Sequence, residues 1–136
     1  MSRVRVKKSR AGLGLFANDV FKRGELVAEY IGERISEDEA NRRGGKYLFE
    51  INTRWTIDGK DRKNLARYIN HSCTPNCYPE VDERARRVFI YAKKKILPGE
   101  ELTYDYGTTY CKEYIYPLGC RCENCKIPAR TQASKN

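Results

Sequence analysis

Short apolar segments alternate with turn residues along most of this sequence. The segment LVAEYI follows the turn Lys-Arg-Gly, and KYLFEI and RWTID alternate apolar with polar side chains on either side of Asn52-Thr53. Such alternation around a turn is typical of a β-hairpin. The segments that predict strands are residues 26–31, 46–51, 54–58, 85–96 and 102–107. Many short strands with little helix predict a mostly β domain.

Helix is expected in two places only. Ser36 followed by Glu39 three residues later is the signature of a helix start, and Gly44-Gly45 marks its end. Residues 64–69 (NLARYI) have room for one or two further helical turns.

Length and composition fit one small domain. The chain has 136 residues, of which 40% are hydrophobic and 33% charged, and it is too rich in Ile, Leu, Val and Tyr to be disordered throughout. No stretch approaches the roughly 18 consecutive apolar residues of a membrane-spanning helix. The basic start lacks the apolar run of a signal peptide. We therefore expect a soluble intracellular protein without membrane contact, whose reduced cysteines are free to bind metal.

The net charge of +9 leaves two interpretations open. It describes either a solvated basic surface or affinity for nucleic acid. The basic residues look scattered, in RVRVKKSR, NRRGGK, ERARR and KKK, and no nucleic-acid motif organises them. Charge alone does not decide the function.

Three cysteines close to the end of the chain predict a zinc site. Cys120, Cys122 and Cys125 form a Cys-x-Cys-x-x-Cys cluster, which is one ligand short of the four that tetrahedral zinc requires. On the residues alone, the candidates for the fourth ligand are Cys73, Cys77, Cys111 and His71.

Residues 67–77 (RYINHSCTPNC) hold the only histidine of the chain and two of its six cysteines. Taken alone, this stretch fits a metal site, a nucleophile with its base, or a polar loop. Each interpretation needs support from the rest of the sequence.

The order of several motifs supplies that support. GLGLF, EYIGE, YLFEI, ARYINHSCTPNC, GEELTYDYG and CRCENC follow one another between about residues 10 and 125. Together they resemble the SET domain of protein-lysine methyltransferases followed by a cysteine-rich post-SET segment. Each motif alone is weak, whereas the ordered set is highly specific.

The resemblance implies a fold of several small β-sheets with a knot-like threading, an exception to the rule against threaded chains. It divides the chain into a SET domain (residues 1–107), a post-SET zinc segment (108–128) and a flexible tail (129–136). We expect a minimal, stand-alone member without a preceding zinc cluster, and with a very short insert between Ile35 and Tyr47.

The resemblance also implies that S-adenosylmethionine binds on one face while a lysine enters through a channel from the other. Asn70 and His71 match the pair that contacts the cofactor. An ion pair is an equal alternative for Arg67, and a plain turn or a core tyrosine is the alternative for the glycines and for Tyr47. The full set implied to bind the cofactor is Ala11, Gly12, Leu13, Gly14, Tyr47, Arg67, Asn70, His71 and Arg121.

Tyr106 matches the family's essential tyrosine, whose hydroxyl lies beside the transferring methyl. Tyr104 matches a position that carries Phe or Tyr, and a tyrosine there implies mono- or dimethylation. For zinc, the resemblance adds Cys73 to Cys120, Cys122 and Cys125 and leaves Cys77 and Cys111 free. The spacing of the last two cysteines is shorter than is usual in the family, yet Cys-x-x-Cys remains a common zinc spacing.

The function implied is methyl transfer to a protein lysine, with a histone tail as the first candidate and another basic protein as the second. Glu33, Glu37, Asp38 and Glu39 are expected to line an acidic substrate groove, and the positive charge to contact nucleosomal DNA. We expect a monomer, with a dimer as the alternative. The location is nuclear in a eukaryote or virus and cytoplasmic in a bacterium. The alternative function is an inactive SET-like or small zinc module that binds nucleic acid or chromatin.

Overall fold

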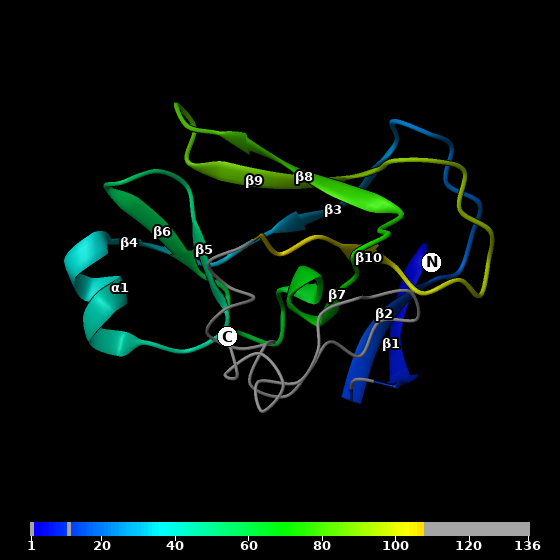
Figure 1. Ribbon diagram of the computed structural model, residues 1–136, viewed down its shortest axis with the longest axis horizontal. Coiled ribbons are helices and arrows are strands. Elements are labelled where there is room, and N and C mark those ends of the chain that lie inside the picture. Colours follow the sequence, from blue (N-terminus) through cyan, green and yellow to red (C-terminus); the bar gives the residue numbers. More distant parts are fainter. Residues whose placement is uncertain (1, 11, 108–136) are drawn as a thin grey trace, which may run out of the picture.

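The structure, a computed structural model, describes residues 2–10 and 12–107. These residues form small β-sheets, one short α-helix and one 3₁₀ turn, which confirms the expected mostly β class (Figure 1). No helix in this part of the chain is long and apolar enough to span a bilayer. In chain order the elements are β1 (Val4–Ser9), β2 (Gly12–Ala17), β3 (Leu26–Tyr30), β4 (Glu33–Ser36), α1 (Glu37–Arg43), β5 (Leu48–Glu50), β6 (Trp55–Asp58), η1 (Leu65–Tyr68), β7 (Asn70–His71), β8 (Cys77–Asp82), β9 (Arg87–Ala92) and β10 (Thr103–Tyr104).

The strands of the described residues pair into four sheets. Three sheets are antiparallel: the β1–β2 hairpin, the sheet β3–β9–β8 and the sheet β4–β6–β5. The fourth is a parallel pair, β7 with β10, in which Asn70 lies opposite Thr103 and His71 opposite Tyr104. Parallel strands need a long connection. Here β8 and β9 form part of that connection.

Most of the predicted elements are confirmed, whereas the hairpin of β1 and β2 was not predicted. Residues 12–17, which begin with the GLGLF motif, form strand β2. Residues 14–17 of this strand are all buried, because β2 pairs with β1 on one edge and bonds to residues 100–102 on the other. The Ala17 amide donates to the Glu100 carbonyl (2.9 Å), and the Leu102 amide donates to the Leu15 carbonyl (2.8 Å).

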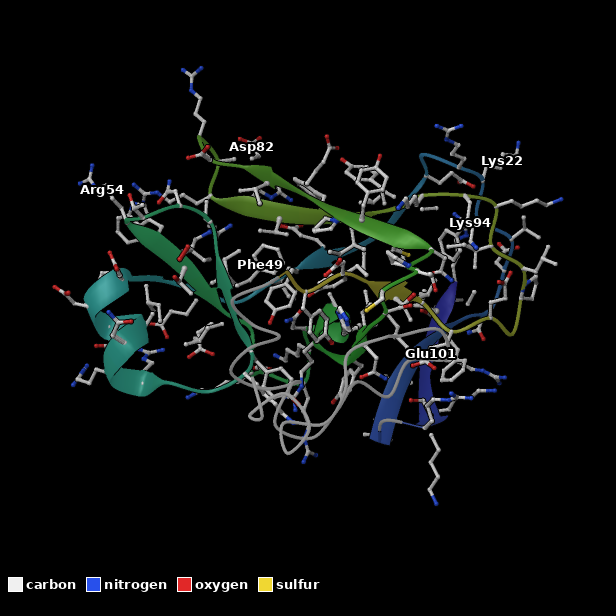
Figure 2. The ribbon with its side chains drawn as sticks, viewed as in Figure 1. Lys22, Phe49, Arg54, Asp82, Lys94 and Glu101 are labelled. Atoms are coloured by element: carbon white, nitrogen blue, oxygen red, sulfur yellow. The ribbon has the colours of Figure 1, made fainter. Side chains whose placement is uncertain are left out.

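One hydrophobic core joins the sheets. Val88, Ile90 and Ala92 of β9 are fully buried, and they alternate with residues that face the other side of the sheet. Burying each large aliphatic side chain contributes about 1.5–3 kcal/mol. Phe49 of β5 packs against this core and lies between its own sheet and β10 (Figure 2).

Helix α1 begins and ends where its capping residues place it. The Ser36 hydroxyl accepts from the Glu39 amide (3.2 Å), and Gly44 with φ of 63° ends the helix. The Glu39 carboxylate does not complete the reciprocal cap, because it binds Arg43 (2.6 Å) and Arg42.

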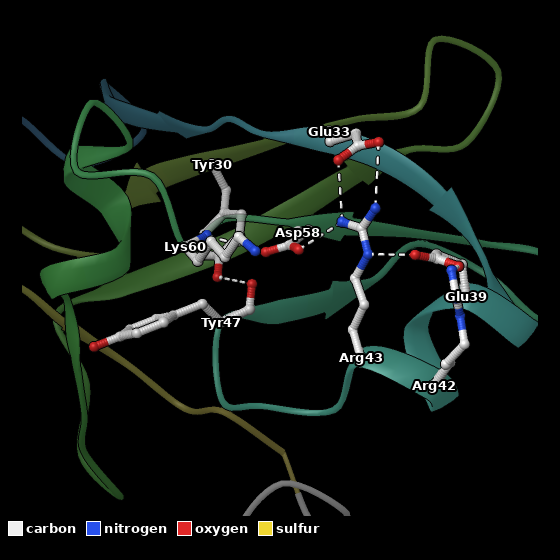
Figure 3. Close-up of polar contacts among 8 residues, drawn as sticks. All are labelled: Tyr30, Glu33, Glu39, Arg42, Arg43, Tyr47, Asp58 and Lys60. Atoms are coloured by element: carbon white, nitrogen blue, oxygen red, sulfur yellow. Dashed lines mark hydrogen bonds and ion pairs between the residues drawn. The ribbon is translucent and has the colours of Figure 1, made fainter.

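Arg43 fastens α1 to the neighbouring sheet (Figure 3). Besides Glu39, its guanidinium binds Glu33 of β4 (3.0 Å) and Asp58 of β6 (2.8 Å). The two strand carboxylates differ in environment: the Asp58 side chain is 6% exposed and that of Glu33 is 65% exposed. Asp58 also accepts from the Lys60 amide (3.2 Å).

This difference yields a prediction for stability. Asp58→Ala removes a buried acceptor from the partly buried Arg43 guanidinium and from the Lys60 amide, and should lower the free energy of unfolding by about 2 kcal/mol. Glu33→Ala removes only an exposed partner of the same Arg43 and should cost about 0.5 kcal/mol or less. Urea unfolding of both variants measures the two values. Equal losses would contradict the assignment of Asp58 as the anchor.

Candidate functional site

A cavity of about 510 Å³ lies beside α1 and β5. Part of its lining comes from α1 and the loop that follows the helix, and another part comes from the two tyrosines of the TYDY motif. The lining includes Tyr30, Glu37, Asn41, Lys46, Tyr47, Phe49, Glu50, Arg67, Tyr104 and Tyr106. The site therefore combines residues from both halves of the chain.

Aromatic rings form a continuous side of this cavity. The ring centroids of Tyr30 and Phe49 are 5.2 Å apart, those of Phe49 and Tyr104 6.4 Å, and those of Tyr104 and Tyr106 5.0 Å. The Tyr30 hydroxyl donates to the carbonyl of Tyr47, the residue just before β5 (2.9 Å; Figure 3). This hydrogen bond fixes the position at which β5 begins. Such a wall suits a bound side chain that has a long apolar stem and a polar group at its end.

His71 is buried and holds the backbone of Tyr106. Its Nδ1 accepts from the Tyr106 amide (3.1 Å), so the proton of the neutral ring is on Nε2. Burial lowers the pKa of His71, while the Asp105 carboxylate at 3.8 Å acts in the opposite direction. The hydroxyl of Tyr106 donates to the Ile69 carbonyl. Residues 69–71 therefore fix Tyr106 at its amide and at its hydroxyl.

Asn70 lies where three strands meet. Its side-chain Nδ2 is within hydrogen-bond distance of the Leu13 carbonyl (3.0 Å), the Ser9 hydroxyl (3.1 Å) and a Glu101 carboxylate oxygen (2.8 Å). Gly14 lies at the same place, since a Cβ there would be 2.4 Å from that Glu101 oxygen. Two predicted residues, Gly14 and Asn70, are thus brought together around one carboxylate.

Sequence reasoning did not single out Ser9, Asn76 or Glu101. Asn76 is buried; its Nδ2 donates to the Glu101 carbonyl (2.8 Å), and its Oδ1 accepts from the Thr103 amide (2.9 Å). Both Asn76 and Glu101 lie within motifs that carry the resemblance, and that position was the one signal in the sequence that could have pointed to them. Nothing local distinguishes Asn76 from an ordinary turn asparagine after proline.

Arg67 and Tyr47 stack at the cavity wall. The guanidinium carbon lies 4.2 Å from the Tyr47 ring centroid and 5.0 Å from that of Tyr68, and Arg67 donates to the Lys60 carbonyl. Within residues 2–10 and 12–107 Arg67 makes no ion pair. Its buried Nε has no hydrogen-bond partner in this part of the chain, which leaves a donor for an acceptor on a ligand.

The two cysteines in the described part of the chain differ sharply. Cys73 is exposed, with Sγ 3.4 Å from Nε2 of His71. Cys77 is fully buried, and burial raises the pKa of its thiol to about 12. Zinc binds the thiolate. Cys73 therefore suits a ligand and Cys77 does not. Cys111, Cys120, Cys122, Cys125, Arg121 and Ala11 lie outside the described residues, within which no group of three candidate metal ligands occurs.

The carboxylates expected in an acidic substrate groove are distributed over two places, and their role toward a substrate stays a prediction. Glu33 and Glu39 bind Arg43, and of the four predicted carboxylates Glu37 alone lines the cavity. Glu50 of β5, which was not predicted, lines it as well.

Comparisons with known proteins agree with the motif order. Residues 12–107 match the family model of the SET domain. Over 125 residues the chain is 38% identical to "Histone-lysine N-methyltransferase trithorax" of Drosophila virilis, covering 85% of this chain and 3% of that protein. It is 43% identical over 105 residues to "Histone-lysine N-methyltransferase, H3 lysine-4 specific" of Schizosaccharomyces pombe, covering 69% and 11%. It is 42% identical over 106 residues to "Histone-lysine N-methyltransferase set-2" of Caenorhabditis elegans, covering 70% and 7%. The chain thus spans only a small part of these curated relatives.

Proposed function

The chain belongs to the SET-domain family, and on that premise we propose that it transfers methyl groups from S-adenosylmethionine to lysine side chains of a protein. The convergence of Tyr104 and Tyr106 on an aromatic-walled cavity carries this proposal. Histones are the proposed substrate, because the relatives above are named as histone-lysine N-methyltransferases. Chromatin is accordingly the proposed place of action.

The neighbourhood of Asn70 fits the methyl donor. Exposed Gly12 and Leu13 offer backbone groups, and the absence of a side chain at Gly14 keeps the approach beside Glu101 open. The Arg67 Nε is a further donor. We propose that Gly12, Leu13, Gly14, Tyr47, Arg67, Asn70 and His71 hold the cofactor, with Ala11 and Arg121 from outside the described residues. When bound, the cofactor supplies a methyl group on a positive sulfonium.

The cavity residues prepare the lysine. A free lysine has a pKa of about 10.4, so neutralising it at pH 7 costs roughly 4–5 kcal/mol. The rings of Phe49, Tyr104 and Tyr106 exclude water and so disfavour the ammonium form. They also confine the amine, and such positioning is a large part of rate enhancement in a displacement reaction. In this proposal the Tyr106 hydroxyl aligns the amine and does not act as a strong base.

Glu37 and Glu50 are the proposed acidic contacts for a basic substrate, since they are the carboxylates of the cavity lining. Lys46 and Arg67 line the same cavity, so this acidity is local. The knot-like threading is proposed as well. In its support, residues 100–104 hydrogen-bond to β2 and also pair with β7.

Tyr106→Phe tests the proposed reaction. It removes the aligning hydroxyl and should reduce methyl transfer about 100-fold or more, while circular dichroism reports an unchanged fold. The assay uses labelled S-adenosylmethionine with histones, nucleosomes and a lysate, and mass spectrometry locates the methylated lysines. Methyl transfer by Tyr106→Phe at the rate of the parent chain would exclude the proposed role of the Tyr106 hydroxyl. Absence of transfer by the parent chain on every substrate would favour the alternative, an inactive binding module.

Tyr104→Phe tests the proposed preference for mono- and dimethylation. The Tyr104 side chain is buried at the cavity wall. In this proposal its hydroxyl takes up space that further methyl groups would need, and it makes that part of the wall polar. The variant should shift the products toward trimethyllysine. Mass spectrometry of a single peptide substrate measures the distribution, and an unchanged distribution would contradict this role.

We also propose one structural zinc ion held by Cys73, Cys120, Cys122 and Cys125. The exposure of Cys73, against the burial and high pKa of Cys77, supports this choice of ligand. Elemental analysis should find about one zinc per chain. Cys73→Ser should lose it, and the matched Cys77→Ala variant should keep it. Retention of zinc by Cys73→Ser would contradict the assignment.

A further inference from the structure

Two basic turns that lie far apart in the sequence are joined in the structure. Residues 22–24 follow Phe21, and residues 93–95 precede Ile96. The amides of Phe21 and Ile96 each donate to the other residue's carbonyl (3.0 and 2.9 Å). At the other end, the Gly24 amide donates to the Ala92 carbonyl (2.8 Å). The two turns are therefore held side by side.

These turns carry five cations, which we call the basic patch: Lys22, Arg23, Lys93, Lys94 and Lys95. All five are exposed, and none makes an ion pair with the described residues. The adjacent carboxylate, Glu25, is bound to Arg3 (3.3 Å). Figure 2 shows Lys22 and Lys94 at the same end of the molecule.

An aromatic surface adjoins the basic patch. Tyr78 of β8 lies opposite Tyr91 of β9, and their rings stack with centroids 5.7 Å apart. Tyr78 is 37% exposed, and neither ring belongs to the hydrophobic core. The next position along β9 is Ala92, and the Lys93 amide then donates to the Asn76 carbonyl (2.8 Å). The Tyr91 ring therefore belongs to the strand that leads into the 93–95 turn, two residues before Lys93.

We infer that the basic patch and the Tyr78–Tyr91 pair form a binding site for single-stranded nucleic acid. Cations that track a phosphate backbone next to rings on which bases stack are the two elements such sites combine. Further along the same face, the exposed carboxylates of Glu80 and Asp82 repel phosphate and confine the site to this end.

The inference does not depend on the proposed enzymatic function, because the surface contains none of the cavity residues. It assigns a binding role to one exposed group of cations in a chain whose net charge is +9. Binding is measured without cofactor or lysine substrate, so its failure and the failure of methyl transfer are separate results.

Fluorescence anisotropy of the full chain with a labelled oligothymidylate of about twelve nucleotides tests the site. Affinity should fall steeply as salt rises. Lys93→Gln/Lys94→Gln should weaken binding and reduce the slope of log K against log salt by about 1.4. Tyr78→Leu, which keeps an apolar side chain on the sheet, should weaken binding by about fivefold.

Arg54→Gln/Arg84→Gln is the matched control. It removes the same charge from the opposite end of the molecule, where Figure 2 places Arg54, and both arginines are exposed. This control should bind like the parent chain. The inference would be overturned if the parent chain did not bind the oligonucleotide, or if the two double variants weakened binding equally. It would also be overturned if a duplex of the same length bound with equal affinity and Tyr78→Leu had no effect.

Discussion

The buried side chain of Asn76 fixes the segment on which the proposed site depends. Its amide binds the Glu101 carbonyl and the Thr103 amide, and so sets the position of residues 101–103 just before Tyr104. A buried asparagine with both ends of its amide bonded is costly to replace, because any apolar substitute leaves two backbone groups without partners. The parallel pairing of β10 with β7 then aligns Tyr104 beside His71.

The same segment shapes both sides of the proposed reaction. Glu101 binds Asn70 and lies against Gly14 on the cofactor side, whereas Tyr104 and Tyr106 line the cavity on the lysine side. His71 connects the two, because it follows Asn70 in β7 and its Nδ1 accepts a hydrogen bond from the Tyr106 amide. A shift of this short segment would therefore disturb cofactor binding and lysine positioning together.

Local chemistry determined what the sequence predicted well. Ser36 and Gly44 set the ends of α1, and the apolar run within residues 85–96 predicted the strand that the structure shows as β9. Pairings between distant residues were not predictable, because β7 and β10 contain two residues each and have no periodicity to detect. The β1–β2 hairpin was missed since its valines lie among lysines and arginines. The basic residues looked scattered for the same reason: contacts between distant residues, Phe21 with Ile96 and Gly24 with Ala92, bring the basic patch together.

Calorimetric titration with S-adenosylhomocysteine, the demethylated cofactor, tests whether the cofactor binds beside Asn70. We expect the parent chain to bind it, Asn70→Ala to weaken binding by about tenfold or more, and Tyr106→Phe to leave binding nearly unchanged. That outcome would show that Asn70 contributes to cofactor binding and that the Tyr106 hydroxyl does not. Binding by Asn70→Ala as tight as that of the parent chain would contradict the placement of the cofactor beside Asn70 and Gly14.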